Sequence, residues 1–386
     1  MKSKRKCPVC GHSEAMFLHF QKFQLLEGCP LPDSYDVVSC EKCGMVYADV
    51  NAGQEDYSSY YRDFSKYASE TLGAGGYASD CERNRFQFLV KKLKAAVSTE
   101  DSIVDIGCAK GGFLCAFRDA GFKNLTGVDP SADCVRIVSE TGLNAVQGSV
   151  PGLPVANKYK MILFANTLEH VLDLDGAVKN LSDICEDNGM LYIEVPDAES
   201  YANFEQVPYY YFDIEHINHF NEDALMNLLG RYEFSQKFAF RHEIDVSSKK
   251  YPMLGVVFEK KGKELGTVVK SLRLRESITR YISGASFDRI NTLLAPYIDK
   301  GPVIVWGAGQ FTARLLPSTS LSKCEIAYFV DKDPGKVGKN INGAPIKSPK
   351  DIKEKFPIVI CSALFVDEIV REIAAMGLDN VVIPLI

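Results

Sequence analysis

The sequence lacks the features of membrane proteins and of proteins that bind nucleic acid through a basic surface. None of its apolar runs approaches the roughly 18 residues of a membrane-spanning helix. The basic start, Lys2 to Lys6, leads into Cys-Pro-Val-Cys-Gly and not into the apolar core of a signal peptide. With 44 Lys and Arg against 50 Asp and Glu, the chain has a net charge of −6 and no basic excess for a phosphate backbone. We therefore expect a cytoplasmic protein without a membrane or nucleic-acid partner.

The length and the cysteine content indicate an intracellular chain of several domains. Its 386 residues suffice for two or three domains of about 100–200 residues, and 46% hydrophobic residues support sizeable cores. Twelve cysteines without a secretion signal favour reduced thiols and metal ligation over disulfides.

Two Cys-x-x-Cys-Gly motifs lie 29 residues apart near the N-terminus, and their thiols belong to Cys7, Cys10, Cys40 and Cys43. Together they predict a tetrahedral four-cysteine zinc site. Four thiolates leave no open position for water, so this zinc would fold the module and would not catalyse. A redox pair is disfavoured because neither motif opens a thioredoxin-like βαβ unit, and a chance pairing is the other alternative. Strands at residues 17–26 and 35–39 would fill the gap.

The central feature of the sequence is a strand, a glycine turn and a helix at residues 102–120. An apolar run ends in Asp105, glycines follow at positions 107, 111 and 112, and a helical pattern starts at Phe113. A second strand ends in Asp129, about twenty residues on, where a parallel α/β sheet places an acid against ribose hydroxyls. This spacing predicts a site for an adenosine-containing cofactor, and an ordinary tight βα turn is the alternative.

The chain continues as an α/β sheet. Further strands are predicted at residues 144–149, 161–165, 189–195, 235–242 and 253–260, and helices at 83–97, 132–140, 177–185 and 223–229. Open α/β sheets bind ligands at the carboxyl ends of their strands. Polar residues at two of these ends are candidate ligand contacts, namely Gln147, Ser149, Asn166, Glu169 and His170.

Aromatic and titratable residues crowd the segment between the fifth strand and the next helix. Glu215 and His216 stand at its centre, and its other candidate residues are Tyr209, Tyr211, Asp213 and His219. Because the segment would open onto the cofactor, we expect it to contact substrate or to catalyse. The alternatives are satisfied structural histidines and a second metal site, which the cysteine motifs make unnecessary.

Three other segments complete the chain. Residues 57–80 form a tyrosine-rich connecting segment, too polar for a regular core element, that is either a lid or substrate wall or a packed linker. Residues 263–299 contain helix formers and predict a helical bridge. Residues 300–386 begin a second strand, glycine turn and helix with Gly307 and Gly309, and a later strand ends in Asp331. They predict a Rossmann-like domain that either holds a second nucleotide or is a structural βαβ unit.

The spelling Asp105-Ile-Gly-Cys-Ala-Lys-Gly resembles the glycine turn of class I S-adenosylmethionine methyltransferases more than the turn of nicotinamide proteins. Cysteine motifs, this core, Glu215-His216-Ile-Asn-His-Phe and a second α/β domain together resemble bacterial nucleotide-sugar C-methyltransferases. The resemblance implies an α/β protein with a doubly wound methyltransferase sheet and a second Rossmann-like domain. Its predicted divisions are a zinc module at 1–56, the connecting segment, a methyltransferase core at 81–262, the bridge and the C-terminal domain.

The resemblance also implies roles for individual residues. S-adenosylmethionine would be bound by Asp105, Gly107, Cys108, Gly111, Asp129, Gln147, Ser149, Asn166, Glu169 and His170. His216 would be the base, paired with Glu215, that removes a proton beside the keto group of a nucleotide-linked deoxysugar. Tyr209, Tyr211 and His219 would bind this substrate.

Three other functions stay open at this point. An O- or N-methyltransferase would need less help from a base. A non-catalytic protein that binds a nucleotide sugar is disfavoured by the intact Asp105, Gly107 and Asp129. A nicotinamide oxidoreductase working through the C-terminal turn lacks a convincing acid or base near that turn.

Overall fold

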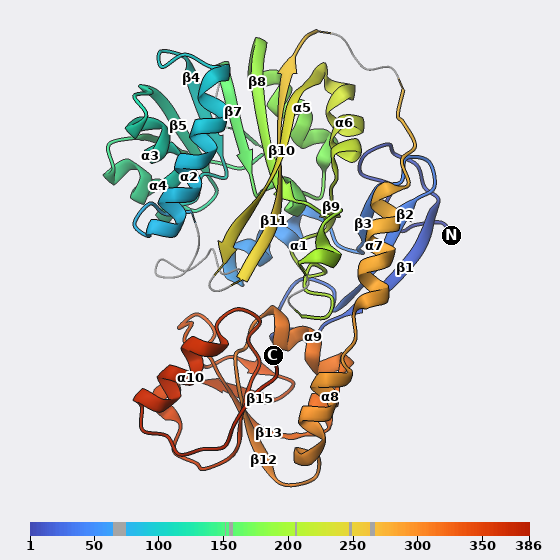
Figure 1. The fold of residues 1–386 in the computed structure, drawn as a ribbon, viewed down its shortest axis with the longest axis vertical. Coiled ribbons are helices and arrows are strands. Elements are labelled where there is room, and N and C mark those ends of the chain that lie inside the picture. The colour runs from blue at the N-terminus through green and yellow to red at the C-terminus, as the bar shows by residue number, and fades with distance from the viewer. Residues whose placement is uncertain (65–74, 151, 154–156, 205–206, 247–248, 263–266) are drawn as a thin grey trace.

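The computed structural model describes residues 1–64, 75–150, 152–153, 157–204, 207–246, 249–262 and 267–386. In Figure 1 a large sheet lies at the top, an N-terminal sheet at the right and a third sheet at the bottom. The large sheet and the third sheet lie within single predicted domains, whereas the N-terminal sheet takes one strand from the predicted methyltransferase core; the domain boundaries stay predictions. No helix in the described part of the chain is long and apolar enough to cross a membrane.

The N-terminal sheet is antiparallel and contains β1 (Ala15–Lys22), β2 (Ser34–Cys40), β3 (Val46–Asp49) and β9 (Asn218–His219), in that order. The first strand is predicted at residues 17–26, so the prediction starts two residues late and runs four residues past the end of β1. The fourth strand comes from far along the chain, since Val46 pairs with His219 and Tyr47 with Asn218. The N-terminal sheet is thus completed by the segment that carries Glu215 and His216.

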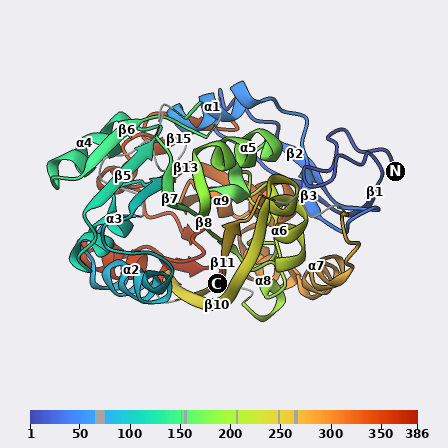
Figure 2. The ribbon, with the colours of Figure 1, turned by 90° about the horizontal axis from the view of Figure 1, so that it is seen from above.

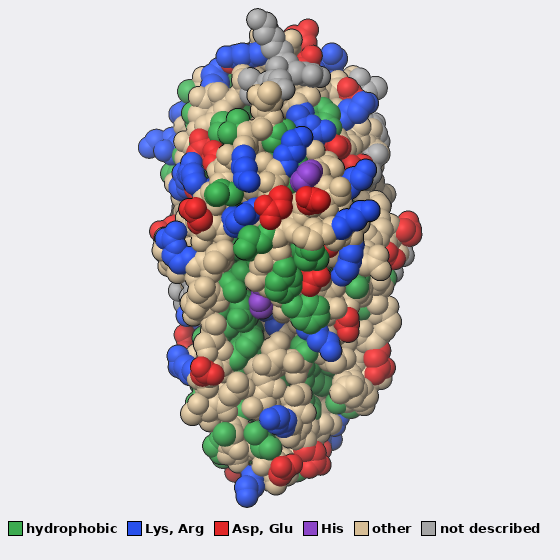
Figure 3. Space-filling model, turned by 90° about the vertical axis from the view of Figure 1, so that its right-hand side faces the viewer, with side chains coloured by type: hydrophobic (Ala, Val, Ile, Leu, Met, Phe, Trp, Pro, Cys, Tyr) green, Lys and Arg blue, Asp and Glu red, His purple; other side chains and the backbone are tan. Residues whose placement is uncertain are grey.

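The edge strand β1 carries apolar residues on its outer side. Met16, Phe17 and Phe20 are each about half exposed. Figure 3 shows hydrophobic side chains gathered across the middle of the face on which this sheet lies.

The large sheet has seven strands, in the order β10-β11-β8-β7-β4-β5-β6. Its members are β4 (Ser102–Ile106), β5 (Asn124–Asp129), β6 (Asn144–Gln147), β7 (Tyr159–Ala165), β8 (Cys185–Pro196), β10 (Phe234–Val246) and β11 (Lys249–Lys260). The strands from β6 to β8 are parallel, whereas β11 is antiparallel to both of its neighbours. The predicted seven strands, the last two joined without a helix, are therefore present.

Helices cover both faces of this sheet because its strands are apolar on both sides. Its helices are α2 (Asp80–Leu93), α3 (Gly112–Asp119), α4 (Ala132–Glu140), α5 (Leu174–Ile184) and α6 (Glu222–Leu229). Along β7, Met161 and Leu163 pack in one core with α2 and α3. Ile162 and Phe164 pack in the other core with α5 and α6. Figure 2 shows α2 and α5 on opposite sides of the strands.

The third sheet has the order β14-β15-β13-β12-β16-β17 and is parallel except at β14. Its strands are β12 (Pro302–Trp306), β13 (Glu325–Val330), β14 (Asn340–Ile341), β15 (Ala344–Lys347), β16 (Ile358–Ile360) and β17 (Val382–Pro384). Its helices are α9 (Gln310–Ser318) and α10 (Val366–Ala375). The predicted bridge contains two helices, α7 (Arg273–Gly284) and α8 (Asp288–Leu294).

The expectation of an irregular connecting segment is wrong at its start, because α1 (Gln54–Asp63) is a helix. Tyr57 and Tyr60 are buried in it, three residues apart. Aromatic residues at helical spacing form an inward stripe even where the surrounding residues are polar. Tyr67 lies outside the described residues.

Candidate active site

The turn after β4 has the backbone of a ligand cradle. Gly107 and Gly111 have φ values of 79° and 75°, in the left-handed region where glycine is favoured. A Cβ atom at Gly107 would lie 2.7 Å from Thr167 Oγ1, and one at Gly111 would lie 2.8 Å from Val138. The Gly107 N–H donates to the carbonyl of Val128 at 2.8 Å. The glycines thus let the turn approach neighbouring segments closely.

Asp129 joins this turn to the next strand. Its carboxylate accepts hydrogen bonds from the Ala109 and Ser131 N–H groups, both at 2.9 Å. Burial raises the pKa of Asp129. Each carboxylate oxygen keeps acceptor capacity beyond the one backbone bond that it takes. The predicted ribose acceptor therefore lies at the turn, on the strand end where the sequence places it.

The neighbouring strand end brings two more predicted contacts to the same edge. Gln147 is the register partner of Asp129 between β6 and β5, and its side chain donates to the Pro130 carbonyl at 3.0 Å. Ser149 forms an isolated bridge with Gly152. Cys108, by contrast, is buried, and its sulfur would lie 2.7 Å from a Cβ atom at Gly127, so it packs inward.

Asp105 lies beneath the turn, beside an ion pair that the sequence did not reveal. Burial raises the pKa of Asp105 to about 8. Arg85, from α2, lies 2.6 Å from Glu194, whose other oxygen accepts the Tyr192 hydroxyl at 2.8 Å. Burial alone would raise the pKa of Glu194, but Arg85 helps to lower it to about 2. A single arginine in an amphipathic helix gave no signal for this contact.

The segment after β7 contributes the 3₁₀ turn η3 (Leu168–His170). Asn166, at its start, has a φ of 50° and donates its N–H to the Glu194 carbonyl at 2.8 Å. Glu169 is buried, and burial raises its pKa to about 8. His170 Nε2 lies 3.8 Å from Glu169 Oε1. The predicted residues 166, 169 and 170 therefore share one turn at the carboxyl edge of the sheet.

The loop at residues 207–217 rests on this turn. The Ile217 N–H donates to the Glu169 carbonyl at 3.0 Å, and His170 Nδ1 lies 3.1 Å from the Glu215 carbonyl. The His170 and His216 rings meet edge to face, with centroids 4.7 Å apart. The structure thus brings the predicted base next to the predicted cofactor edge.

Asp213 organises the turn of this loop. Its Oδ1 accepts the N–H groups of Glu215 and His216, both at 2.8 Å, while Oδ2 lies 3.9 Å from His216 Nδ1. Burial would raise the pKa of Asp213, but His216 lowers it below the usual value. The His216 side chain is 18% exposed, so a small molecule can reach it.

The three other predicted substrate contacts lie deeper in the protein. His219 is fully buried in β9, and burial lowers its pKa to about 3. The ring of Tyr211 stacks on Tyr201 with centroids 3.9 Å apart, and its hydroxyl donates to the Phe204 carbonyl. Tyr209 is partly buried and stacks on His19 at 4.2 Å. Substrate contact by these residues stays a prediction.

Tyr60 belongs to the tyrosine-rich segment, from which the sequence did not single out one residue. Its hydroxyl donates to Glu215 Oε1 at 2.8 Å inside the protein. The helical spacing of Tyr57, Tyr60 and Phe64 was the available signal, because it aims these rings to one side of α1.

The described residues contain two groups that could hold a metal ion. The four predicted cysteines lie with their sulfur atoms within 4.8 Å of one another; Cys7 and Cys43 are 3.6 Å apart, and Cys10 and Cys40 are 3.5 Å apart. Sulfur ligands about 2.3 Å from a tetrahedral zinc lie roughly 3.8 Å apart, which fits this cluster. The second group is Glu169, His170 and His216, at the site itself.

Two family models match the chain. A model described as a methyltransferase domain matches residues 78–236, and a model described as C2185-like, N-terminal, matches residues 299–383. The first match contains the glycine turn, Asp129 and the loop with Glu215 and His216. The chain is therefore an S-adenosylmethionine-dependent methyltransferase with an α/β class I methyltransferase-like fold.

Several solved structures resemble part of the chain. One is an S-adenosylmethionine-dependent methyltransferase from Methanosarcina mazei, with 16% identity, a TM-score of 0.38, and 44% of this chain and 97% of that chain covered. The PH0226 protein from Pyrococcus horikoshii has 20% identity and a TM-score of 0.40, with 53% of this chain and 99% of that chain covered. A methyltransferase from Clostridium acetobutylicum has 12% identity and a TM-score of 0.39, with 54% and 99% covered. No curated protein matches the chain.

We expect Asp129→Ala to weaken binding of S-adenosylmethionine at least tenfold, about 1.4 kcal/mol, because the ribose hydroxyls lose their acceptor. Titration calorimetry with the cofactor or with its demethylated product measures this change. Asp129→Asn keeps an acceptor oxygen for the turn and tests whether the charge matters. Asp133→Ala, in the first turn of α4 with its side chain 48% exposed, is the control. Unchanged affinity in a folded Asp129→Ala protein would overturn the assignment.

Proposed function

We propose that this S-adenosylmethionine-dependent methyltransferase methylates a carbon atom of a keto-deoxysugar carried on a nucleotide. The observation that carries the proposal is the placement of His216, which is reachable from solvent, faces Asp213 and lies beside the turn after β7. Carbon, unlike an oxygen or nitrogen with a lone pair, becomes a nucleophile only after it loses a proton. A histidine at the cofactor edge supplies the base for that step.

Asp213 would set the protonation of His216. Its carboxylate, 3.9 Å from Nδ1, favours a proton on that nitrogen and leaves the lone pair on Nε2. Nε2 would take the proton from the carbon beside the carbonyl. The electron pair of that C–H bond would stay on this carbon, shared with the carbonyl oxygen, and would form the new bond to the methyl group. Such general-base help contributes about 10²–10⁴-fold.

Of the two carboxyl groups in the site, Glu169 would be neutral and Asp213 would carry a negative charge. With a pKa of about 8, Glu169 is mostly protonated at pH 7, whereas Asp213 is ionised. A neutral Glu169 leaves Asp213 as the negative partner of His216. Pairs of carboxyl groups with separated pKa values are typical of sites that move protons.

S-adenosylmethionine, when bound, supplies a methyl group attached to a positively charged sulfur. The sulfur is the leaving group and keeps the electron pair of the S–CH₃ bond. We assign its binding to the turn at Gly107 and Gly111, to Asp129 and to the other predicted contacts at this edge. The chain's own contribution is alignment of the acceptor and exclusion of water. The Glu215 carboxylate would accept a hydrogen bond from a hydroxyl group of the sugar.

The C-terminal turn would support the nucleotide part of the substrate. Its backbone repeats the first turn, because the Gly307 N–H donates to the Val330 carbonyl at 2.8 Å and the Ala308 N–H to Asp331 at 2.8 Å. It differs in that Lys336 Nζ lies 3.3 Å from Asp331. Lys336 thus pairs with the Asp331 carboxylate, which the ribose hydroxyls of a nicotinamide dinucleotide would need as their hydrogen-bond acceptor.

We also propose that Cys7, Cys10, Cys40 and Cys43 hold one structural zinc ion. The fit of their sulfur positions to the four ligands of a tetrahedral zinc supports it. The zinc would stabilise the sheet that β9 completes. Through β9 it would support the loop at residues 207–217, which we call the acceptor loop because it would contact the methyl acceptor.

The acceptor itself is found by incubating the protein with a panel of nucleotide-linked keto-deoxysugars and isotopically labelled S-adenosylmethionine. Mass spectrometry of the products should show one added methyl group that remains on carbon after fragmentation. A methyl group on oxygen or nitrogen would favour the O- or N-methyltransferase instead.

His216→Asn should keep cofactor binding and lose turnover by about 10²-fold or more, because no base remains for the carbon acid. In heavy water, the rate at which the acceptor carbon exchanges its hydrogen for deuterium should fall together with turnover. His219→Gln is the comparison, and because His219 is buried we expect lower thermal stability but turnover of the folded fraction. If His219→Gln abolishes turnover while His216→Asn stays active, the base is His219. If both remain active, carbon methylation loses its base.

Elemental analysis of the purified protein should find one zinc per chain. Cys7→Ser should lose the metal and unfold at a lower temperature, since structural zinc contributes to folding. Cys29→Ser is the matched control, because Cys29 is partly buried and lies outside the cluster. A metal-free protein, or full zinc and stability in Cys7→Ser, would show that the cluster is not a zinc site.

Calorimetry should detect no binding of NAD or NADP tighter than about 1 mM, which corresponds to about −4 kcal/mol. The reason is that Asp331 is engaged by Lys336. Tight binding of either cofactor, or hydride transfer to the substrate, would refute this view of the C-terminal turn.

A further inference from the structure

The first helix of the third sheet reaches the acceptor loop through a chain of hydrogen bonds. Gln310 Nε2 donates to the Tyr60 hydroxyl at 3.0 Å, and that hydroxyl donates to Glu215 Oε1 at 2.8 Å. An amide nitrogen can only donate, so the hydroxyl accepts from Gln310 and its own proton points to the carboxylate. The direction of both bonds is thereby fixed, and Glu215 is held as an acceptor.

A second side chain of α9 holds the same loop from its other end. Arg314, one helical turn after Gln310, is fully buried and donates from Nη1 to the Tyr210 carbonyl at 2.8 Å and to the Phe212 carbonyl at 3.4 Å. Residues four apart in a helix lie on the same face. One face of α9 therefore supports the loop on both sides of Asp213.

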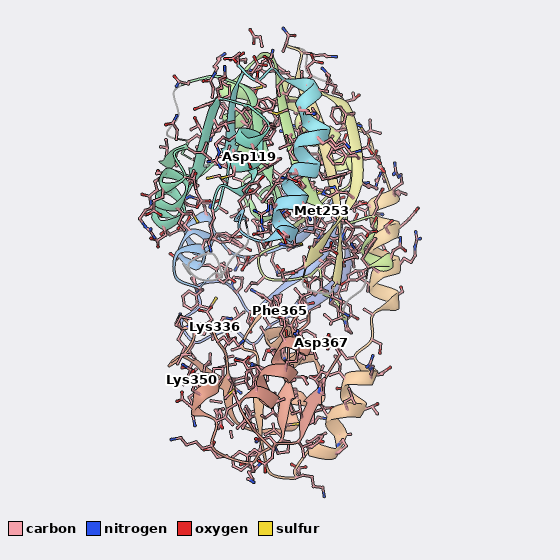
Figure 4. The ribbon with its side chains drawn as sticks, turned by 60° about the vertical axis from the view of Figure 1, so that its left-hand side comes forward. Asp119, Met253, Lys336, Lys350, Phe365 and Asp367 are labelled. Carbon is pink, nitrogen blue, oxygen red and sulfur yellow. The ribbon has the colours of Figure 1, made fainter. Side chains whose placement is uncertain are left out.

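Gln310 directly follows the glycine turn of the C-terminal domain. Gly309 is the N-cap of α9, and Gln310 is its first residue. In Figure 4, Phe365 and Asp367, at the start of α10, lie at the end of the third sheet that faces the large sheet. The carboxyl ends of the parallel strands in both sheets thus face one site from opposite sides.

We propose that Gln310 is a positioning residue for methyl transfer, which orients Glu215 through the Tyr60 hydroxyl. The acceptor site is then assembled from three parts of the chain, whereas the cofactor turn belongs to the large sheet alone. This inference rests on the proposed function for the role of Glu215 as a contact of the sugar. It predicts an effect on the acceptor and none on the cofactor.

The test compares Gln310→Met, which removes the donor at similar length, with Gln310→Lys, which keeps a donor. For the acceptor found in the panel, Gln310→Met should raise KM about tenfold with kcat changed less than about threefold. The affinity for S-adenosylmethionine should stay the same, and Gln310→Lys should recover KM to within about threefold of the parent. A merely structural role would lower the active fraction, and so kcat, without changing KM.

A double-mutant cycle with Tyr60→Phe tests the path. Because both variants break the same chain, their combined effect on KM should not exceed the larger single effect. Gln54→Met, an exposed position on the same helix as Tyr60, is the control. Multiplying effects, or an unchanged KM in Gln310→Met, would overturn the proposal.

Hydrogen exchange gives a second measurement that needs no acceptor. Amides of the loop at 207–217 should exchange faster in Gln310→Met than in Gln54→Met, and unchanged exchange contradicts the proposal. The two hypotheses fail differently. Normal turnover in His216→Asn sinks the carbon-methylation mechanism, whereas additive effects of Gln310→Met and Tyr60→Phe sink the positioning role.

Discussion

The carboxylate of Asp213 is the interaction on which the acceptor loop depends. One of its oxygens takes the N–H groups of Glu215 and His216, and the other faces the imidazole. A loop of this kind has no ladder of its own, so its polar backbone groups need side-chain partners. Fixing two consecutive N–H groups on one oxygen fixes the direction in which both side chains leave the backbone. The geometry of Glu215 and His216 is thus a consequence of one short acid in the turn.

The two glycine turns are alike in backbone and different in charge. In each, the first glycine donates to a strand carbonyl and a following N–H donates to a strand-end aspartate. Burial raises the pKa of Asp129, whereas Asp331 lies 3.3 Å from the Lys336 ammonium group. A fold repeated within one chain therefore need not repeat its ligand, because ligand choice depends on a few side chains added to the turn.

Much of this arrangement could be predicted from local patterns. The turn at Gly107 and the strand-end Asp129 follow from glycine spacing and an apolar run, and the cysteine cluster follows from two short motifs. Contacts between distant segments left no such pattern. Arg85 and Tyr60 are ordinary members of amphipathic helices, and their partners Glu194 and Glu215 lie more than one hundred residues away. His216 is partly exposed whereas His219 is fully buried, a difference that the sequence does not reveal.

The pairing of β3 with β9 has a consequence for anyone who rebuilds this protein from parts. Val46 and Tyr47 form a ladder with His219 and Asn218, so the N-terminal sheet and the acceptor loop share an edge. A graft that took the loop from a homologue and kept the original N-terminal module would set two unrelated surfaces against each other. Chimeras designed to exchange acceptor preference should therefore treat the module and the loop as a single cassette, although the two paired strands lie far apart in the sequence.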